Sequence, residues 1–225
     1  MKAVIFDLDD TLYPYVQHVH SGFAVVAMYV DRNFHIPARD AYATLRFARE
    51  VDAQGCEFQR LCDVHRLNRS IVPDLLREYN GHRPQLWLTH DAAAVLGSLR
   101  RGGWRLGLLT NGDPAIQKKK VDVLGLAALV DHVVYASEHA PGGKPAGEPF
   151  IEVLRRLQVA PEDAVMVGDD PINDVDGARA IGLRTIFLAR TGRPRHDGAD
   201  AVVHALSDVP AAAAALLDRG MAHAA

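Results

Sequence analysis

Two aspartates stand two residues apart directly after a short apolar segment near the start of the chain. Asp7 and Asp9 follow residues 2–6, Lys-Ala-Val-Ile-Phe. In an extended chain, residues at this spacing project to the same side. One carboxylate can then attack an electrophile while the other manages a proton. The same residues also suit an acidic turn in which Asp9 or Asp10 caps a helix, so the pair alone leaves both interpretations open.

A second acidic cluster follows a later apolar segment. Gly168 precedes Asp169 and Asp170, and Asp174 comes four residues after Asp170. Carboxylate oxygens are hard ligands suited to Mg2+, which combines a few of them with water and phosphate oxygens. Taken alone, the cluster is equally typical of an Asx turn and a helix N-cap.

Two further polar segments can complete a site for an anion. Thr110-Asn111-Gly112 offers a hydroxyl and backbone N–H groups ahead of a predicted helix, which suits an oxyanion cradle. Lys144 lies in the glycine-rich segment 141–147. There it can neutralise a carboxylate and a phosphate together, although a lone Lys-Pro pair in a loop is more commonly a surface feature.

Short apolar segments must position these side chains. We expect strands at residues 2–6, 105–110, 130–135, 164–168 and 184–188, with a weaker one at 201–203. We expect helices at residues 91–101, 114–124, 148–157 and 171–181, the last of them ending at Gly182. This alternation indicates an α/β fold with a doubly wound parallel sheet. Ligands of such sheets bind outside the carboxyl ends of the strands, and the candidate residues fall there.

The stretch from Pro14 to about Arg83 lacks comparable strand segments and instead shows apolar residues at helical spacing. We interpret residues 14–85 as a helical insertion in a core made of residues 1–13 and 86–225. Pro37 and Pro73 are expected to break its helices. Its basic residues either contact a second anionic group or form a solvated face; they are Arg46, Arg49, Arg60, His65, Arg66 and Arg69.

The composition is that of an ordinary globular protein of 225 residues, with 48% hydrophobic residues and a formal net charge of -3. Because 25 Lys plus Arg are balanced by 28 Asp plus Glu, we expect no nucleic-acid partner. The run Lys118-Lys119-Lys120 is interpreted as a solvated helix face. Cys56 and Cys62 fit neither a metal nor a disulfide pattern, so we expect free thiols.

The chain has no apolar stretch near the roughly 18 residues that a membrane span requires. The apolar segment at residues 2–6 meets three carboxylates by Asp10, which excludes a signal-peptide core. We therefore expect no membrane association, a cytoplasmic location, and a monomer or homodimer.

The order of the four polar segments is more specific than any one of them. They are Phe6-Asp-Leu-Asp-Asp-Thr-Leu12, Leu108-Leu-Thr-Asn-Gly112, Lys144 to Phe150, and Val167-Gly-Asp-Asp-Pro-Ile-Asn-Asp174. In this order the chain resembles the haloacid dehalogenase-like (HAD) superfamily, and most closely its phosphatase branch with a helical C1-type cap. Pyrimidine 5'-nucleotidase-like members are similar in that their first segment also ends in Thr-Leu-Tyr.

The resemblance implies a Rossmann-like core, a helical cap inserted after the first segment, and an aspartyl-phosphate mechanism. By position, Asp7 would be the nucleophile, and Asp9 would protonate the leaving group and then activate water. Lys144 would lie beside the nucleophile. The phosphate-binding candidates are Asp10, Thr110, Asn111 and Lys144.

The resemblance also implies Mg2+ as the cofactor. Its ligands would be the Asp7 carboxylate, the Asp9 backbone carbonyl and Asp169. Asp170 and Asp174 are candidates for holding those ligands in place.

Three alternatives share part of this pattern. A phosphomutase has the same core residues and differs in its cap. A haloacid dehalogenase attacks carbon and needs no acid for a phosphate leaving group, so Asp9 argues against it. A receiver-type phosphorylation switch is normally shorter and takes its acidic residues from different strands. We therefore expect a Mg2+-dependent phosphomonoesterase that acts on a small phosphorylated metabolite, such as a nucleoside monophosphate or a sugar phosphate.

Overall fold

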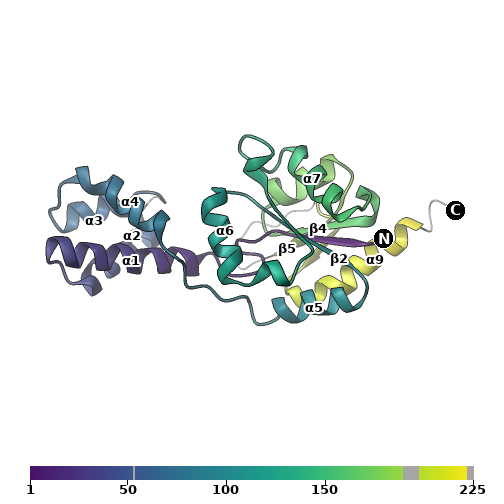
Figure 1. Cartoon of the computed structure of the whole chain (residues 1–225), viewed down its shortest axis with the longest axis horizontal. Helices are drawn as coiled ribbons and strands as arrows, with labels where there is room; N and C mark the ends of the chain where they lie inside the picture. The colour runs from purple at the N-terminus through teal and green to yellow at the C-terminus, as the bar shows by residue number, and fades with distance from the viewer. Residues whose placement is uncertain (53, 190–197, 222–225) are drawn as a thin grey trace. The chain divides into compact units, whose positions relative to one another are not determined.

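The computed structural model describes residues 1–52, 54–189 and 198–221. The chain divides into two compact units, which both appear in Figure 1. The α/β unit comprises Met1–Pro14 and Trp87–Ala225, and the helical unit comprises Tyr15–Leu86. The predicted boundaries, 1–13, 14–85 and 86–225, differ from these by one residue at each junction.

Six parallel strands form the sheet of the α/β unit. They are β1 (Ala3–Phe6), β2 (Arg105–Thr110), β3 (His132–Tyr135), β4 (Ala164–Gly168), β5 (Arg184–Leu188) and β6 (Ala201–Val203). Their spatial order is β3-β2-β1-β4-β5-β6, which is the strand order of a Rossmann-type sheet. The predicted α/β class with a doubly wound parallel sheet is confirmed.

The central strand β1 is buried along its whole length, as expected for a parallel strand covered on both faces. Its neighbour β2 contains Gly107. A Cβ atom at that position would lie 2.9 Å from Val153 and 3.0 Å from Leu157, both on α7. The glycine therefore allows α7 to pack close against the sheet.

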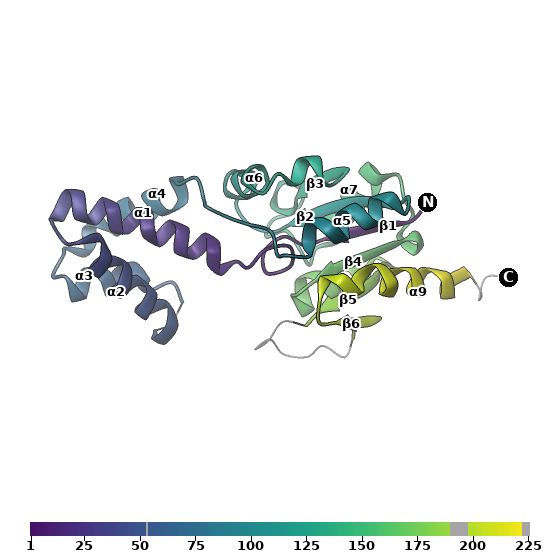
Figure 2. The ribbon, with the colours of Figure 1, turned by 90° about the horizontal axis from the view of Figure 1, so that it is seen from below.

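Helices cover both faces of this sheet, with α5 and α9 side by side on one face and α7 on the other (Figures 1 and 2). The helices of this unit are α5 (Ala92–Arg101), α6 (Pro114–Val123), α7 (Gly147–Leu157), α8 (Gly177–Ala180) and α9 (Val209–Met221). One prediction is wrong in detail: residues 171–181 do not form a single α-helix. Pro171–Asp176 is π-helical and continues into α8. The N–H of Val175 donates to the carbonyl oxygen of Asp170, five residues earlier (3.3 Å), while the Asp170 side chain caps the first turn.

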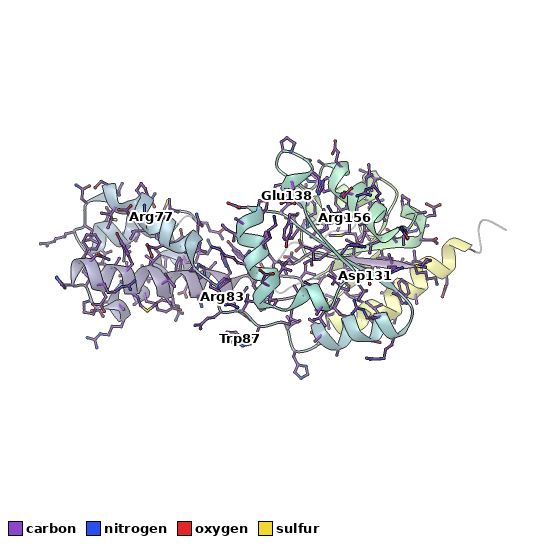
Figure 3. All side chains as sticks on the ribbon, in the orientation of Figure 1. Arg77, Arg83, Trp87, Asp131, Glu138 and Arg156 are labelled. Carbon is purple, nitrogen blue, oxygen red and sulfur yellow. The ribbon has the colours of Figure 1, made fainter. Side chains whose placement is uncertain are left out.

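The edge strand β3 is held from two sides. Arg156 on α7 donates to the carbonyl oxygen of Val133 (3.1 Å), and Asp131 accepts from the N–H of Leu106 (2.7 Å). Figure 3 labels both charged residues. An edge strand exposes unpaired backbone groups, and Arg156 satisfies one of them.

The helical unit contains α1 (Val16–Phe34), α2 (Ala38–Val51), α3 (Glu57–Val64) and α4 (Val72–Gly81). Its core includes Val19, Phe23, Val26 and Val30, which recur every three or four residues on α1. Pro37 separates α1 from α2 as predicted. By contrast, the prediction that Pro73 breaks a helix is wrong, because it occupies the first turn of α4, where proline costs no hydrogen bond.

Two predictions about the whole chain can be compared with the structure. Among the described residues, no helix combines the length and the apolar character needed to span a bilayer. Cys56 is exposed, Cys62 is buried, and both are free thiols as predicted.

Candidate active site

Three adjacent strands end at the same edge of the sheet and carry predicted site residues. Asp7 follows β1, Thr110 ends β2, and Asp169 follows β4. Because β1 pairs in parallel with both β2 and β4, these ends are neighbours. The N–H of Asp7 donates to the carbonyl oxygen of Val167 (2.9 Å), which extends the ladder one residue beyond β1.

Lys144 reaches this edge from the loop after β3. Its Nζ atom donates to Asp7 Oδ1 (2.6 Å), Asp174 Oδ1 (2.6 Å) and the carbonyl oxygen of Leu109 (3.0 Å). All three donors of the ammonium are thus used. The side chains of Lys144 and Asp174 are buried, and that of Asp7 is 10% exposed. The predicted pairing of Lys144 with Asp7 is present, and Asp174 joins it.

The pKa values of Asp7 and Lys144 are both raised, as expected where buried carboxylates outnumber the cations that neutralise them. Burial raises the pKa of Asp7 to about 8, against the opposing effect of Lys144. Burial alone would lower the pKa of Lys144, but Asp174 and Asp7 raise it above its ordinary value. One ammonium therefore faces two buried carboxylates, and only one of them can be neutralised by it.

Asp7, Asp169 and Asp174 form a buried cluster in which each offers one oxygen, all within 4.8 Å of one another. Two of these three clustered carboxylates share the Lys144 ammonium, and such oxygen ligands fit a hard divalent cation such as Mg2+. Asp7 and Asp169 were predicted as ligands. Asp174, predicted as a supporting residue, lies in the cluster itself, while the ligand role of the Asp9 carbonyl stays a prediction.

Asp170 caps the following helical segment, although it is the neighbour of Asp169. Its Oδ1 accepts from the N–H groups of Ile172 (2.9 Å) and Asn173 (2.8 Å), and its Oδ2 accepts from Asn173 Nδ2 (2.9 Å). Burial would raise the pKa of Asp170, but these hydrogen bonds lower it overall. The capping interpretation of the acidic cluster therefore fits Asp170.

Gly168 explains how Asp174 can approach the strand end. A Cβ atom at this position would lie 2.1 Å from Asp174 Oδ2, a separation that atoms cannot adopt. The same oxygen accepts from the N–H of Asp170 (3.1 Å). The glycine before the two aspartates is thus required for the packing of the third one.

The Asn111 side chain forms hydrogen bonds with both the backbone N–H and the backbone carbonyl oxygen of Lys144. Its Oδ1 accepts from the N–H of Lys144 (2.8 Å), and its Nδ2 donates to the carbonyl oxygen of Lys144 (3.0 Å). Gly143 has a φ of 72°, and a Cβ there would lie 2.4 Å from Asn111 Oδ1. In this structure the Asn111 side chain, predicted to bind phosphate, holds the lysine loop.

The Asp9 carboxylate does not share the hydrogen-bond partners of Asp7; it contacts side chains of α6. Lys120 Nζ lies 2.8 Å from Oδ1 and 2.9 Å from Oδ2, and Gln117 Nε2 donates to Oδ2 (2.9 Å). The hydroxyl of Tyr13 donates to Oδ1. Asp10, the next residue, is half-buried and has a left-handed φ of 58°.

The interpretation of Lys118–Lys120 as a solvated face is wrong for Lys120. Lys118 is exposed and pairs with Glu138 (2.9 Å), but the Lys120 side chain is only 4% exposed. Burial is the largest influence on Lys120 and lowers its pKa, although Asp9 acts in the opposite direction. The turn of α6 directs this one lysine toward Asp9.

Sequence reasoning missed Gln117 and Lys120, although a signal was present. Gln117, Lys120, Val121 and Leu124 are spaced at i, i+3, i+4 and i+7 and are all buried. This spacing defines one face of a helix. Because Lys120 shares this face with Val121 and Leu124, helical periodicity could have predicted its burial. The run of three lysines instead suggested a solvent-exposed face.

Four of the five arginines predicted to contact an anion or form a solvated face are ion-paired within the helical unit. The pairs are Arg46–Glu50, Arg49–Glu57, Arg60–Asp52 and Arg69–Asp63. Arg49 also lines a cavity of about 190 Å³ together with Tyr15, Phe23 and Tyr79. Burial raises the pKa of the Tyr79 hydroxyl above its ordinary value.

A known protein family matches most of the chain. A sequence profile described as "haloacid dehalogenase-like hydrolase" matches residues 1–182. The chain belongs to this family. The resemblance inferred from the four polar segments is confirmed at that level.

This HAD-like hydrolase has phosphatases among its relatives. Ribulose-1,5-bisphosphate 5-phosphatase of Halopiger xanaduensis is 33% identical over 203 residues, covering 83% of this chain and 84% of the relative. N-acylneuraminate-9-phosphatase of Mus musculus is 36% identical over 211 residues, covering 86% and 84%. A solved HAD phosphatase from Thermococcus onnurineus superposes with a TM-score of 0.65 at 26% identity, covering 94% of this chain and 97% of that one. The prediction of a HAD-like phosphatase enzyme is confirmed by these homologues.

Proposed function

We propose that this chain is a Mg2+-dependent phosphomonoesterase that transfers the phosphoryl group of a small metabolite to Asp7 and then to water. The observation that carries the proposal is the burial of Asp7 between Lys144 and the carboxylates of Asp169 and Asp174. A carboxylate needs such compensation to meet a phosphate dianion, because both are negatively charged.

Asp7 must be ionised to act as a nucleophile. With Lys144 alone its pKa is about 8, so a large share of it is protonated at neutral pH. A Mg2+ ion held by Asp7, Asp169 and Asp174 would supply the missing positive charge for both the nucleophile and the phosphate oxygens. Lys144 contributes the other positive charge and keeps Asp7 in place.

The proposed reaction has two steps, phosphoryl transfer to Asp7 and hydrolysis of the aspartyl-phosphate. An Asp7 oxygen forms a bond to phosphorus as the ester P–O bond breaks, and Asp9 donates its proton to the leaving alkoxide. Asp9 then accepts a proton from a water whose oxygen attacks the same phosphorus. Phosphate leaves and the Asp7 carboxylate is restored.

Thr110 is the side-chain donor that we assign to the phosphate oxygens. Its hydroxyl ends β2 beside Asp7, and its Oγ1 accepts from Gln117 Nε2 (2.6 Å). In this structure the hydroxyl donates to the carbonyl oxygen of Asn111 over a long distance (3.4 Å), and a phosphate oxygen would replace that acceptor. Asn111 supports binding indirectly, because both ends of its amide hold the Lys144 loop.

The substrate that we propose first is a phosphorylated sugar, and second a nucleoside monophosphate. The relatives named for a ribulose bisphosphate and for an N-acylneuraminate phosphate support the first choice. The Thr-Leu-Tyr ending at Tyr13 supports the second, through its similarity to pyrimidine 5'-nucleotidase-like members. In either case the helical unit would act as a cap that selects the substrate.

A panel of phosphate esters tests the proposal. Wild-type protein with Mg2+ should release phosphate from sugar phosphates or nucleoside monophosphates, and EDTA should stop it. Asp7→Asn should release none, while Asp122→Asn, the same chemical change on an exposed position of α6, should retain wild-type activity.

Each alternative has its own outcome in the same panel. Stoichiometric phosphorylation without turnover would indicate a phosphorylation switch. Exchange of phosphate between positions of one sugar without net release would indicate a mutase. Halide release from 2-haloacids without phosphatase activity would indicate a dehalogenase. Any of these three results would contradict the proposed phosphomonoesterase.

A further inference from the structure

Asp9 is held by side chains that lie outside the four polar segments. Lys120 contacts both of its carboxylate oxygens (2.8 and 2.9 Å), Gln117 donates to Oδ2 (2.9 Å), and Tyr13 donates to Oδ1. Tyr13, Gln117 and Lys120 are each 3% exposed or less, whereas the side chain of Asp9 is 28% exposed. The carboxylate is thus fixed by buried donors and remains accessible to solvent.

Gln117 connects Asp9 to the predicted phosphate site. Its Nε2 lies within hydrogen-bond distance of Asp9 Oδ2 (2.9 Å), Thr110 Oγ1 (2.6 Å) and the carbonyl oxygen of Asn111 (2.7 Å), so its two N–H groups are shared among three acceptors. These acceptors lie at or directly after the carboxyl ends of two different strands, β1 and β2. A single amide therefore sets the position of the Asp9 carboxylate relative to Thr110.

The burial of Lys120 calls for a physical explanation. Removing an ammonium from water is costly, and a buried ion pair is often no more stabilising than apolar side chains of the same volume. Lys120 lies on the face of α6 that also carries Val121 and Leu124, where an apolar residue would pack. Stability alone does not account for a lysine there, but fixing Asp9 does.

We propose that Lys120 and Gln117 are positioning residues that hold the Asp9 carboxylate at the place where it exchanges a proton with the leaving group and with water. The inference rests on the role proposed above for Asp9. A general acid must lie within hydrogen-bond reach of the atom that it protonates, and a displacement of about 1 Å can reduce a rate on the order of 10²-fold.

The test compares two esters that differ in their need for an acid. An alkyl phosphate has a basic leaving group that requires protonation, whereas 2,4-dinitrophenyl phosphate releases an acidic phenol that does not. The proteins are wild type, Asp9→Asn, Lys120→Met, Lys120→Arg and the double variant of Asp9→Asn with Lys120→Met. Lys118→Met is the matched control, since it removes an exposed lysine from the same helix.

We compare kcat/KM, which reports the first phosphoryl transfer and not the hydrolysis of the aspartyl-phosphate that both esters share. We expect Lys120→Met to lower kcat/KM for the alkyl ester by about tenfold or more, up to the roughly 10² to 10⁴-fold that general acid catalysis contributes. The loss of kcat/KM for the dinitrophenyl ester should be less than about threefold, because its leaving group needs no proton from Asp9. In the Asp9→Asn background, Lys120→Met should cause no further loss. Lys120→Arg should recover part of the alkyl-ester activity, and Lys118→Met should match wild type.

An equal loss of kcat/KM for both esters, or a loss that adds fully to that of Asp9→Asn, would overturn the inference and indicate a structural role. If Lys120→Met fails to fold, Lys120→Gln enters the same comparison, since it removes the charge but keeps a donor. An Asp9→Asn variant with equal losses of kcat/KM for both esters would instead contradict the role of Asp9 as the general acid. The two failures are therefore distinguishable.

Discussion

Asp7 and Asp9 stand two residues apart, yet each faces its own lysine in a different electrostatic setting. Lys144 contacts two buried carboxylates, Asp7 and Asp174, and its pKa is raised. Lys120 contacts both carboxylate oxygens of Asp9, and burial lowers its pKa. Lys144 therefore shares its charge between two buried carboxylates, which leaves negative charge that a cation can satisfy, while Lys120 pairs directly with Asp9.

The largest expected effect comes from removing the charge on Asp7. Asp7→Asn should reduce phosphate release by a factor on the order of 10⁴ or more, as when the nucleophile of a hydrolase is removed. Steady-state kinetics with circular dichroism as a fold check measures this. Asn has the shape of Asp, so a folded variant that retains near-normal turnover would remove Asp7 from the mechanism.

The two lysines should differ in their contribution to stability. In EDTA, Lys144→Met leaves two buried carboxylates without a cation and should lower the free energy of unfolding by about 3–5 kcal/mol. Lys120→Met leaves Asp9 partly solvated and bonded to Tyr13 and Gln117, so about 1–3 kcal/mol is expected. Urea titration gives both values.

Lys118→Met serves as the control for this comparison, because an exposed pair contributes within about 1 kcal/mol. Equal losses for Lys144→Met and Lys120→Met would contradict the difference in charge balance between the two regions. At alkaline pH, a double variant with Asp7→Asn should recover part of the Lys144→Met loss, because Asn cannot acquire the second buried charge that Asp7 gains as it loses its proton.

The pKa of Asp7 predicts how pH acts on the metal-free protein. Its value is about 8 in the folded state against 3.8 for the ordinary carboxyl, so the folded protein retains a proton that the unfolded chain releases. The stability contributed by this group is full below about pH 4 and falls as pH rises to about 8. Thermal unfolding in EDTA across this range should show the decline in wild type and a smaller one in Asp7→Asn.

Mg2+ should reverse this dependence, because the cation competes with the proton for the same carboxylates. Mg2+ affinity should increase as pH rises toward about 8, with proton release measurable by calorimetry in buffers of different ionisation enthalpy. Proton uptake, or affinity that does not depend on pH, would contradict the assignment of Asp7 to the metal cluster.

The smallest expected effect concerns the aspartate that caps a helix. Asp170→Ala removes the acceptor of the Ile172 and Asn173 N–H groups and should cost about 1 kcal/mol of stability with little change in Mg2+ affinity. Asp174→Asn, four residues on, should weaken Mg2+ binding strongly. If Asp170→Ala weakened Mg2+ binding as much as Asp174→Asn, the division between cap and metal cluster would be wrong.

Much of the fold could be predicted because each parallel strand is a nearly continuous apolar segment. The bounds expected for β2, β4, β5 and β6 agree with the structure, and Pro37 marked a helix junction. The helix expected at 171–181 was not found as such, because the backbone there makes an i→i+5 hydrogen bond and a π-helical turn, which apolar periodicity does not encode.

The candidate site was predictable where residues follow strands and less so where helices contribute. Asp7, Thr110 and Asp169 could be placed because parallel strands end at one edge. Lys120 was misplaced because a run of like charges suggests solvent, while its burial depends on which side of α6 faces Asp9. The aspartates after β4 have separate tasks that only side-chain geometry reveals.

The most direct test of the central claim is detection of the phosphoryl group on Asp7. Wild-type turnover of a sugar phosphate with Mg2+ would be quenched in acid, digested, and analysed by mass spectrometry, with Asp7→Asn treated in parallel. We predict one phosphoryl group on Asp7 that hydroxylamine removes, and none in Asp7→Asn. Active turnover with the phosphoryl group on another residue, or with no labelled peptide under conditions that preserve acyl phosphates, would contradict the account.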